Sequence, residues 1–191
     1  MTPTTRKIPA LRTACALALV ISACLPRPSR AAGVLLDRSA AAARLEAAFI
    51  MNFVKFTDWS APDDMSLVVC VIGDEHVGAA VIEALRTTPD GSRVQVRQLA
   101  DQPSTPDCHV AFIAASQMHR ARSILDALRG RPILTVSDGP GFLQAGGMVE
   151  LFVEDGRMRF AVNVDAVEQA HVRLSSHVLG LAKIVHGAHA Q

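Results

Sequence analysis

Two cysteines are the residues of this chain best placed for covalent chemistry. The sequence contains four, but Cys15 and Cys24 lie in an amino-terminal segment with the character of an export signal, which leaves Cys70 and Cys108. In an exported domain, two cysteines with no third to compete are expected to form a disulfide. Such a bridge would close a loop of nearly forty residues and stabilise the fold by about 4 kcal/mol. The alternative is two separate buried thiols.

The histidines give little support to a metal site. His109 adjoins one of the cysteines, but no further cysteine or histidine has the spacing that would complete a site. His171 and His177 are six residues apart and would lie on different faces of a helix. His186 and His189 are three apart, but they stand near the chain terminus, where metal binding would be adventitious. We therefore predict no metal ion.

Known catalytic patterns are absent as well. Gly73 and Gly78 follow a buried apolar run, but no Lys-Ser/Thr pair comes after them, which excludes a P-loop. G-x-G-x-x-G and G-x-S-x-G do not occur. The carboxylate pairs at 63–64 and 74–75 occupy loop positions without a partner that would tune them for acid-base work. The residues predict no catalytic group, no cofactor and no enzyme activity.

The amino terminus has the pattern of a signal peptide. Three basic residues precede the apolar run 14–21, which is too short to span a bilayer. Small residues at 29–32 suit a signal peptidase, which predicts a signal over 1–31 and one domain over 32–191. Residues 21–24 (ISAC) also fit the lipobox of a bacterial lipoprotein, whose cysteine would carry lipid. We expect a periplasmic protein, either soluble or lipid-anchored.

Removal of the signal changes the charge balance. The segment holds five basic and no acidic residues, so Lys+Arg falls from 19 to 14 against 18 Asp+Glu, a net charge of −4. A mildly acidic domain without a basic patch excludes nucleic acid as the expected partner.

Strand and helix patterns alternate through the middle of the chain. Continuous β-branched runs predict strands that are buried on both faces, and periodic segments between them predict helices. The expected strands are 67–72, 94–96, 109–114 and 133–136, and the expected helices are 76–85 and 121–128. This βαβ repetition predicts an α/β fold, a three-layer sandwich with a mostly parallel sheet and helices on both faces.

A first helix is expected over 39–59. Its core face is predicted to carry four apolar side chains, with a tryptophan at its end: Leu45, Phe49, Phe53, Phe56 and Trp59. The aromatic stripe also fits a ligand pocket, but core packing is the simpler interpretation.

The last third of the chain has a different pattern. Two short runs around Asp155-Gly156 predict a β-hairpin at one edge of the sheet. Asp165 and Glu168 resemble a capping box, with Asp165 as the cap of a long carboxy-terminal helix. The expected core face of that helix is Val167, Ala170, Leu174, Val178, Leu181 and Val185.

Three polar residues lie beside that apolar face. Arg173, Ser176 and His177 are either solvated surface or contacts for a partner or a small anionic ligand.

A series of motifs resembles the YfiR family of periplasmic proteins. Residues 49–59 (FIMNFVKFTDW) look like its opening "FxYNFxKFxxWP" signature, although Met51 replaces the tyrosine and the proline is delayed to Pro62. The further matching segments are 70–73 (CVIG), 108–110 (CHV), 133–138 (ILTVSD), 146–148 (GGM), 159–163 (RFAVN) and 174–176 (LSS). Together they cover nearly the whole expected domain in order.

The resemblance implies a repressor without catalytic activity. Members bind the periplasmic sensor region of an inner-membrane diguanylate cyclase and lower cyclic-di-GMP signalling and biofilm formation. An OmpA-like outer-membrane lipoprotein can sequester them, and a disulfide between the residues matching Cys70 and Cys108 links them to redox conditions. The candidate partner or ligand contacts are Asn163, Arg173, Ser176 and His177.

Other functions stay open at this point. The chain could be a small-ligand-binding module that feeds another membrane sensor, such as a histidine kinase. A homodimer is also compatible with the sequence.

Overall fold

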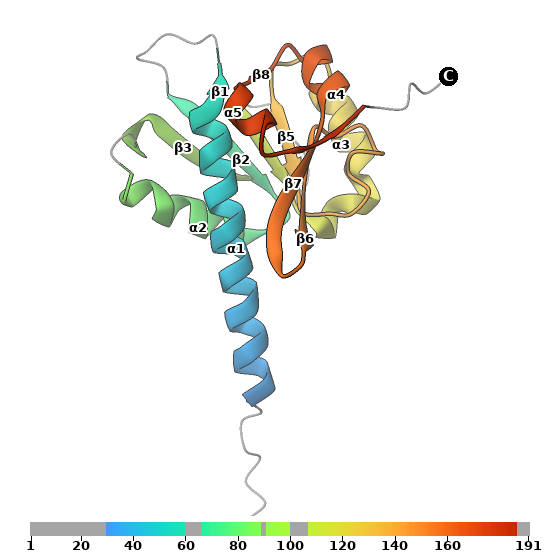
Figure 1. Ribbon diagram of the computed structural model, residues 1–191. Coiled ribbons are helices and arrows are strands. Elements are labelled where there is room, and N and C mark those ends of the chain that lie inside the picture. Colours follow the sequence, from blue (N-terminus) through green and yellow to red (C-terminus); the bar gives the residue numbers. More distant parts are fainter. Residues whose placement is uncertain (1–29, 60–65, 89–90, 100–106, 187–191) are drawn as a thin grey trace, which may run out of the picture.

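Among the residues that the computed structural model describes (30–59, 66–88, 91–99 and 107–186), seven strands form one central sheet in the order β3-β2-β4-β5-β6-β7-β9 (Figure 1). Every neighbouring pair is parallel except β6 and β7, which form an antiparallel hairpin. The strands are β2 (Leu67–Ile72), β3 (Val94–Leu99), β4 (Val110–Ile113), β5 (Leu134–Ser137), β6 (Val149–Glu154), β7 (Arg157–Asn163) and β9 (Lys183–Val185). The mostly parallel sheet of the prediction is confirmed.

Burial along the strands explains this order. All residues of β4 and β5 are buried, as are those of β2 after its first residue, because both faces of these central strands are covered. In β3 every residue is exposed or half-buried, which suits a strand at the edge of the sheet. The continuous apolar runs in the sequence therefore identify the centre of the sheet correctly.

Helices cover both faces. On one face α1 (Arg30–Phe56) and α2 (Glu75–Arg86) pack with α4 (Val164–Gln169) and α5 (Ser176–Leu179). On the other face α3 (Ala121–Leu128) packs over the side chains that alternate with the first set along β2 and β4. The short 3-10 helices η1 (Gly91–Arg93) and η2 (Ala115–Arg120) complete the connections. This is the expected three-layer sandwich.

The buried face of α1 differs from the predicted one. Phe53 is buried as expected, and Phe49 and Phe56 are half-buried, but Leu45 is 51% exposed. The helix instead buries a stripe turned by about one position, namely Ala43, Glu46, Ala47, Ile50, Phe53 and Val54. This stripe combines two alanines with larger side chains, and the prediction for Leu45 is wrong.

The prediction of a long carboxy-terminal helix is also wrong. The chain forms α4, then β8 (Arg173–Leu174), α5 and β9, and the break after α4 comes at His171, whose φ is +56°. Apolar residues spaced by three or four fit these short segments as well as one helix, which is why the pattern misled. Of the expected core face, Val167, Ala170 and Val178 are buried, Leu174 and Val185 are half-buried, and Leu181 is 68% exposed.

The cap of α4 lies two residues earlier than predicted. Asn163, not Asp165, is the N-cap, because its side-chain oxygen accepts a hydrogen bond from the backbone N–H of Ala166 at 3.1 Å. The β6–β7 hairpin is confirmed, but β9 pairs with β7, so β9 rather than the hairpin forms that edge.

A second, two-stranded sheet joins the end of α1 to the carboxy-terminal region. β1 (Thr57–Asp58) pairs antiparallel with β8, and the N–H of Ser175 donates to the carbonyl of Phe56 at 3.0 Å. The predicted signal peptide falls outside the described residues up to position 29, and α1 begins at Arg30. The signal and its cleavage site therefore stay predictions.

Candidate functional site

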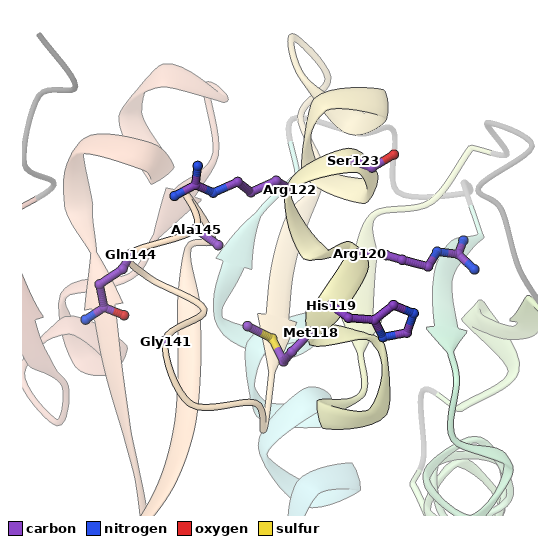
Figure 2. Close-up of a pocket in the computed structure, with 8 residues that line it drawn as sticks. All are labelled: Met118, His119, Arg120, Arg122, Ser123, Gly141, Gln144 and Ala145. Carbon is purple, nitrogen blue, oxygen red and sulfur yellow. The ribbon is translucent and has the colours of Figure 1, made fainter.

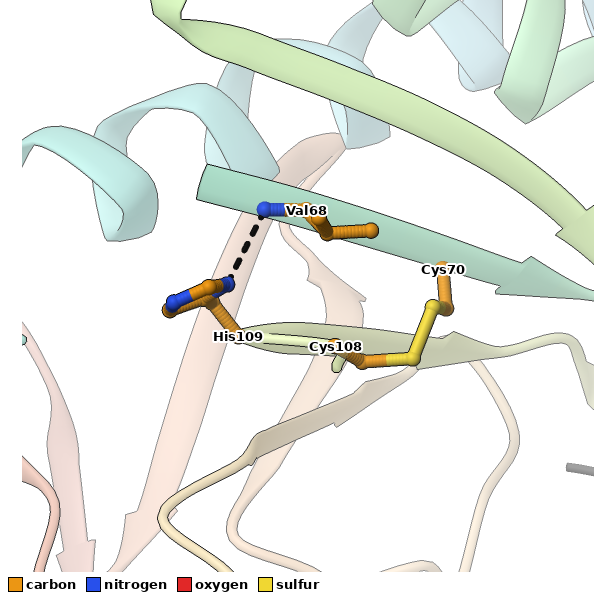
Figure 3. Close-up of a disulfide and its surroundings, with 4 residues drawn as sticks. All are labelled: Val68, Cys70, Cys108 and His109. Carbon is orange, nitrogen blue, oxygen red and sulfur yellow. Dashed lines mark hydrogen bonds between the residues drawn. A yellow bond between two sulfur atoms is a disulfide. The ribbon is translucent and has the colours of Figure 1, made fainter. Parts of the chain in front are cut away.

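The disulfide between Cys70 and Cys108 joins two central strands of the sheet. Cys70 lies within β2 and is fully buried, and Cys108 comes just before β4 (Figure 3). Their Cα atoms are 5.8 Å apart, and 38 residues separate them in the sequence. Both side chains belong to the apolar cluster on the α3 face. The bridge therefore fixes the amino end of β4 against β2 from within the core.

His109 extends the pairing of these two strands with its side chain. The N–H of Val68 donates to Nδ1 of His109 at 3.0 Å, and the N–H of His109 donates to the carbonyl of Val68 at 2.8 Å. Nδ1 can accept only in the neutral ring with its proton on Nε2. Burial lowers the pKa of His109, and the nearby Asp107 carboxylate opposes this in part. The ring thus serves as a hydrogen-bond acceptor within the sheet.

The end of α1 packs over this histidine. The ring of Trp59 meets that of His109 edge to face, with centroids 5.6 Å apart, and its Nε1 donates to the carbonyl of Val54 at 2.9 Å. The ring of Phe56 packs against that of His177 on α5, with centroids 5.2 Å apart. The aromatic residues expected in the first helix therefore connect the disulfide-linked strands with the carboxy-terminal region. We call this end of the sheet, where β2 and β4 begin, the amino end.

Three of the four predicted contact residues lie together at the amino end. Arg173 on β8 and Ser176 and His177 on α5 are exposed beside the end of α1. Arg173 makes a 4.0 Å ion pair with Asp58. Asn163 is different, because it is 4% exposed and its side chain caps α4. The structure brings Arg173 and His177 beside the end of α1, with Ser176 exposed on the same short helix as His177, whereas Asn163 is buried.

The opposite end of the sheet is where α/β proteins usually bind ligands. The connections that follow β2 and β4 lead to helices on opposite faces, and the crevice outside the carboxyl ends of two such strands is the usual ligand site. Here the crevice is filled by the chain itself. The hydroxyl of Ser116 donates to the carbonyl of Gly73 at 3.2 Å, and the side chain of Gln117 packs directly against Gly73. Residues of η2 therefore occupy the position where α/β proteins usually bind a ligand.

Carboxylates surround this crevice. Asp74 caps α2, since its Oδ1 accepts from the N–H groups of His76 and Val77. Asp138 follows β5 and accepts a 2.6 Å hydrogen bond from the N–H of Ala115. The pKa of Asp138 is raised, chiefly by burial and in part by Asp74, although backbone hydrogen bonds oppose the shift. Carboxylates at this position repel anionic groups, which disfavours phosphate-bearing ligands here.

Glu46 on α1 completes this group of carboxylates, and sequence reasoning missed it. Its side chain is 7% exposed, and burial together with Asp138 and Asp74 raises its pKa to about 7. A signal was present in the sequence, because Glu46 stands four residues before Ile50 and seven before Phe53 on the same helical stripe. Choosing Leu45 for the core face concealed it. We call Glu46, Asp74 and Asp138 the carboxylate cluster.

A surface hollow of about 610 Å³ lies between the start of α3 and the loop after β5. Met118 and Arg122 face the loop that holds Gly141, Gln144 and Ala145, whereas His119 and Arg120 extend to the other side of the η2–α3 segment (Figure 2). One guanidinium therefore faces a partly apolar hollow. The sequence analysis did not identify it.

Within the described ranges, no helix combines the length and the apolar character needed to cross a bilayer. In the same part of the chain, no three histidine, cysteine or carboxylate side chains are grouped so that they could hold a metal ion. A comparison with protein families gives a match to the YfiR/HmsC-like family over residues 43–183. The match begins at Ala43, a buried residue of α1, and ends at Lys183, the first residue of β9. It therefore includes six strands of the described central sheet in full and the first residue of β9.

Proposed function

Because the chain belongs to the YfiR/HmsC-like family, we propose that it is a periplasmic regulatory protein that binds the sensor region of an inner-membrane diguanylate cyclase and represses it. The family match over residues 43–183 is the observation that carries this proposal. In this role the protein lowers cyclic-di-GMP signalling and biofilm formation. It acts by binding, without catalysis or a cofactor. An OmpA-like outer-membrane lipoprotein would release the cyclase by sequestering it.

The disulfide supports the periplasmic location. Stable disulfides persist in oxidising compartments and are rare in the cytosol. Cys70 and Cys108 are both buried, so the disulfide is part of the hydrophobic core. This agrees with export by the predicted signal over residues 1–31.

The partner surface that we propose is the exposed part of the amino end. Arg173 and His177 offer hydrogen-bond donors beside the aromatic end of α1, and Ser176 lies between them in the sequence. Asn163 holds this surface in place through its cap rather than by contact. The ion pair of Arg173 is largely exposed, which leaves the guanidinium available to a partner at small cost.

A test uses a strain that lacks the gene. Complementation with the wild-type chain should lower cellular cyclic-di-GMP, and Arg173→Glu combined with His177→Glu should fail to do so. The matched control is Arg157→Glu, an exposed arginine in the β6–β7 hairpin at the other end of the sheet. Co-purification with the periplasmic segment of the cyclase should follow the same order. A cyclic-di-GMP level that does not respond to the wild-type gene would overturn the proposal.

The hollow beside α3 favours a second candidate, a small-ligand-binding module that feeds another membrane sensor such as a histidine kinase. Arg122 and the apolar side chain of Met118 suit a small anionic compound with an apolar part. Thermal stabilisation of the purified protein by such compounds, lost in Arg122→Ala, would favour this candidate. Stabilisation that persists in Arg122→Ala would place the ligand elsewhere.

A further inference from the structure

Glu46 lies on the buried stripe of α1, where the other side chains are apolar. Its neighbours on the buried stripe are Ala43, Ala47 and Ile50, all of them less exposed than Glu46 itself at 7%. Among the described residues, no hydrogen bond or ion pair to its carboxyl group is found. A charged carboxylate in such a site is costly because it lacks the solvation and the partners that it has in water.

Among the described residues, the two charged groups that act on Glu46 are both carboxylates. Asp138, which follows β5, and Asp74, at the start of α2, both oppose its ionisation. Each aspartate is held in place by backbone N–H groups, so neither can turn away without losing its hydrogen bonds. The nearby ionisable residues Arg44 and Glu75 are exposed to solvent. Seating α1 on the sheet therefore brings three carboxyl groups together without a cation between them.

We propose that Glu46 is a proton-controlled latch: its neutral form lets α1 seat against the carboxyl end of the sheet, and its ionisation loosens that seat. The pKa of Glu46 is about 7 in the seated helix, whereas the ordinary value is 4.5. Between these two values, opening of the α1 contact releases a proton, so opening becomes more favourable as the pH rises. Below pH 4.5 the seat is fully stabilised, and above pH 7 the loss is complete.

The helix would carry this event to the other end of the sheet. Phe56, the last residue of α1, stands ten positions after Glu46, a distance of about 15 Å at helical rise. The same end of α1 pairs with β8 and contacts His177. Loosening α1 would therefore alter the surface that carries Arg173 and His177. The effect on a partner rests on the proposed function, but the latch itself does not.

The experiment is amide hydrogen exchange on the purified, disulfide-bonded protein from pH 5 to 8, corrected for the intrinsic pH dependence of exchange. We expect the protection of α1 amides, relative to those of β4 and β5, to fall by up to tenfold per pH unit between pH 5 and 7 and then to level off. In Glu46→Gln this dependence should disappear. The matched control, Glu83→Gln, removes an exposed carboxylate on α2 and should behave as the wild type.

Asp138→Asn provides a second arm if Glu46→Gln does not fold. Removing one of the facing charges should move the midpoint of the α1 transition below pH 7, whereas an unrelated cause of loosening would leave the midpoint in place. The inference is overturned if α1 protection does not depend on pH, or if Glu46→Gln keeps the wild-type dependence. These readouts need no partner, so a failed cyclase experiment would not affect them.

Discussion

The two ends of the parallel sheet differ in chemistry and in accessibility. At the carboxyl end, where α/β proteins commonly bind ligands, Ser116 and Gln117 pack against Gly73 and the carboxylate cluster lies nearby. At the amino end, a disulfide fixes the core, while Arg173 and His177 remain exposed above it. In this protein the position of the usual ligand site is taken up by its own side chains, whereas exposed polar side chains lie at the opposite end.

Titration separates the two ends as well. The pKa of Glu46 at the carboxyl end is raised, so the folded protein favours its neutral acid, and the pKa of His109 at the amino end is lowered, so the folded protein favours its neutral ring. The carboxyl end is therefore destabilised as the pH rises and the amino end as the pH falls. Below pH 6.5, the ordinary value for histidine, the loss at the amino end opposes the gain at the carboxyl end, so the two groups partly cancel in the pH dependence of stability.

Replacing both cysteines should have the largest effect. Cys70→Ala with Cys108→Ala removes a covalent link across 38 residues and should lower the free energy of unfolding by about 4 kcal/mol in the chain-entropy model. Urea denaturation measures the change, and the reduced wild-type protein should lose a similar amount. A loss below about 1 kcal/mol would show that the amino end does not depend on its bridge.

Glu46→Gln tests the carboxyl end by pH. Between pH 4.5 and 7 the wild type should lose up to ~3 kcal/mol of stability through this one group, because each unit of pKa shift corresponds to about 1.4 kcal/mol. The variant should lose none of it. Subtracting the unfolding free energies of the two proteins at each pH removes the contributions that they share, including that of His109. A pH-independent difference would mean that the carboxylate cluster does not resist ionisation of Glu46.

Gly73→Ala tests whether the crevice is closed. Gly73 has φ +86°, and a Cβ there would lie 2.4 Å from Cγ of Gln117, so we expect a loss of about 2 kcal/mol. Gly130→Ala is the matched control, because Gly130 has φ +76° with open space around it and should lose only the cost of the backbone conformation. Adding Gln117→Ala should recover part of the difference. Equal losses of unfolding free energy in the two variants would show that the side chain of Gln117 can move to make room for the new methyl group.

His109→Asn tests the amino end from the acid side. An asparagine oxygen can accept the Val68 N–H as Nδ1 does, but it does not titrate. Below pH 6.5 the wild type should lose stability as protonation removes this hydrogen bond, by about 1 kcal/mol, and the variant should not. Trp59 is the only tryptophan in the sequence, and it contacts His109, so its fluorescence reports the same event. If the variant loses stability below pH 6.5 as the wild type does, groups other than His109 cause that loss.

The sequence predicts the centre of the fold better than its periphery. The runs at 67–72 and 109–114 can be identified because strands buried on both faces must be apolar throughout, and the same runs place the cysteines side by side. The carboxy-terminal segments could not be identified in this way. Their apolar residues repeat with helical spacing, and the pairing of β8 with β1 depends on residues more than a hundred positions away. Local pattern does not contain that contact.

The carboxylate cluster shows a second limit. Asp74 and Asp138 each follow a predicted strand, so their proximity could be expected from a parallel sheet. Glu46 reaches them from a helix whose rotation was misjudged by about one residue, and that error exchanges a buried position for an exposed one. Long apolar side chains indicated one face, whereas the face that is buried includes Ala43 and Ala47.

The smallest effect on stability is expected at the surface that we assign to the partner. The ion pair of Arg173 with Asp58 is 4.0 Å long, with side chains 79% and 60% exposed, and such pairs contribute little because water and salt screen them. Arg173→Glu should therefore change the free energy of unfolding by less than about 0.5 kcal/mol, measured by urea denaturation beside Arg157→Glu. The same variant should weaken binding to the cyclase sensor region at least tenfold, while the control binds as the wild type. A surface whose substitution affects binding but not folding is what distinguishes a contact site from a structural one. If Arg173→Glu instead destabilises the fold by more than about 1 kcal/mol, the side chain of Arg173 is needed for folding. The exposed surface at the amino end would then have a structural role, as the carboxyl end has, and the proposed contrast between the two ends would be wrong.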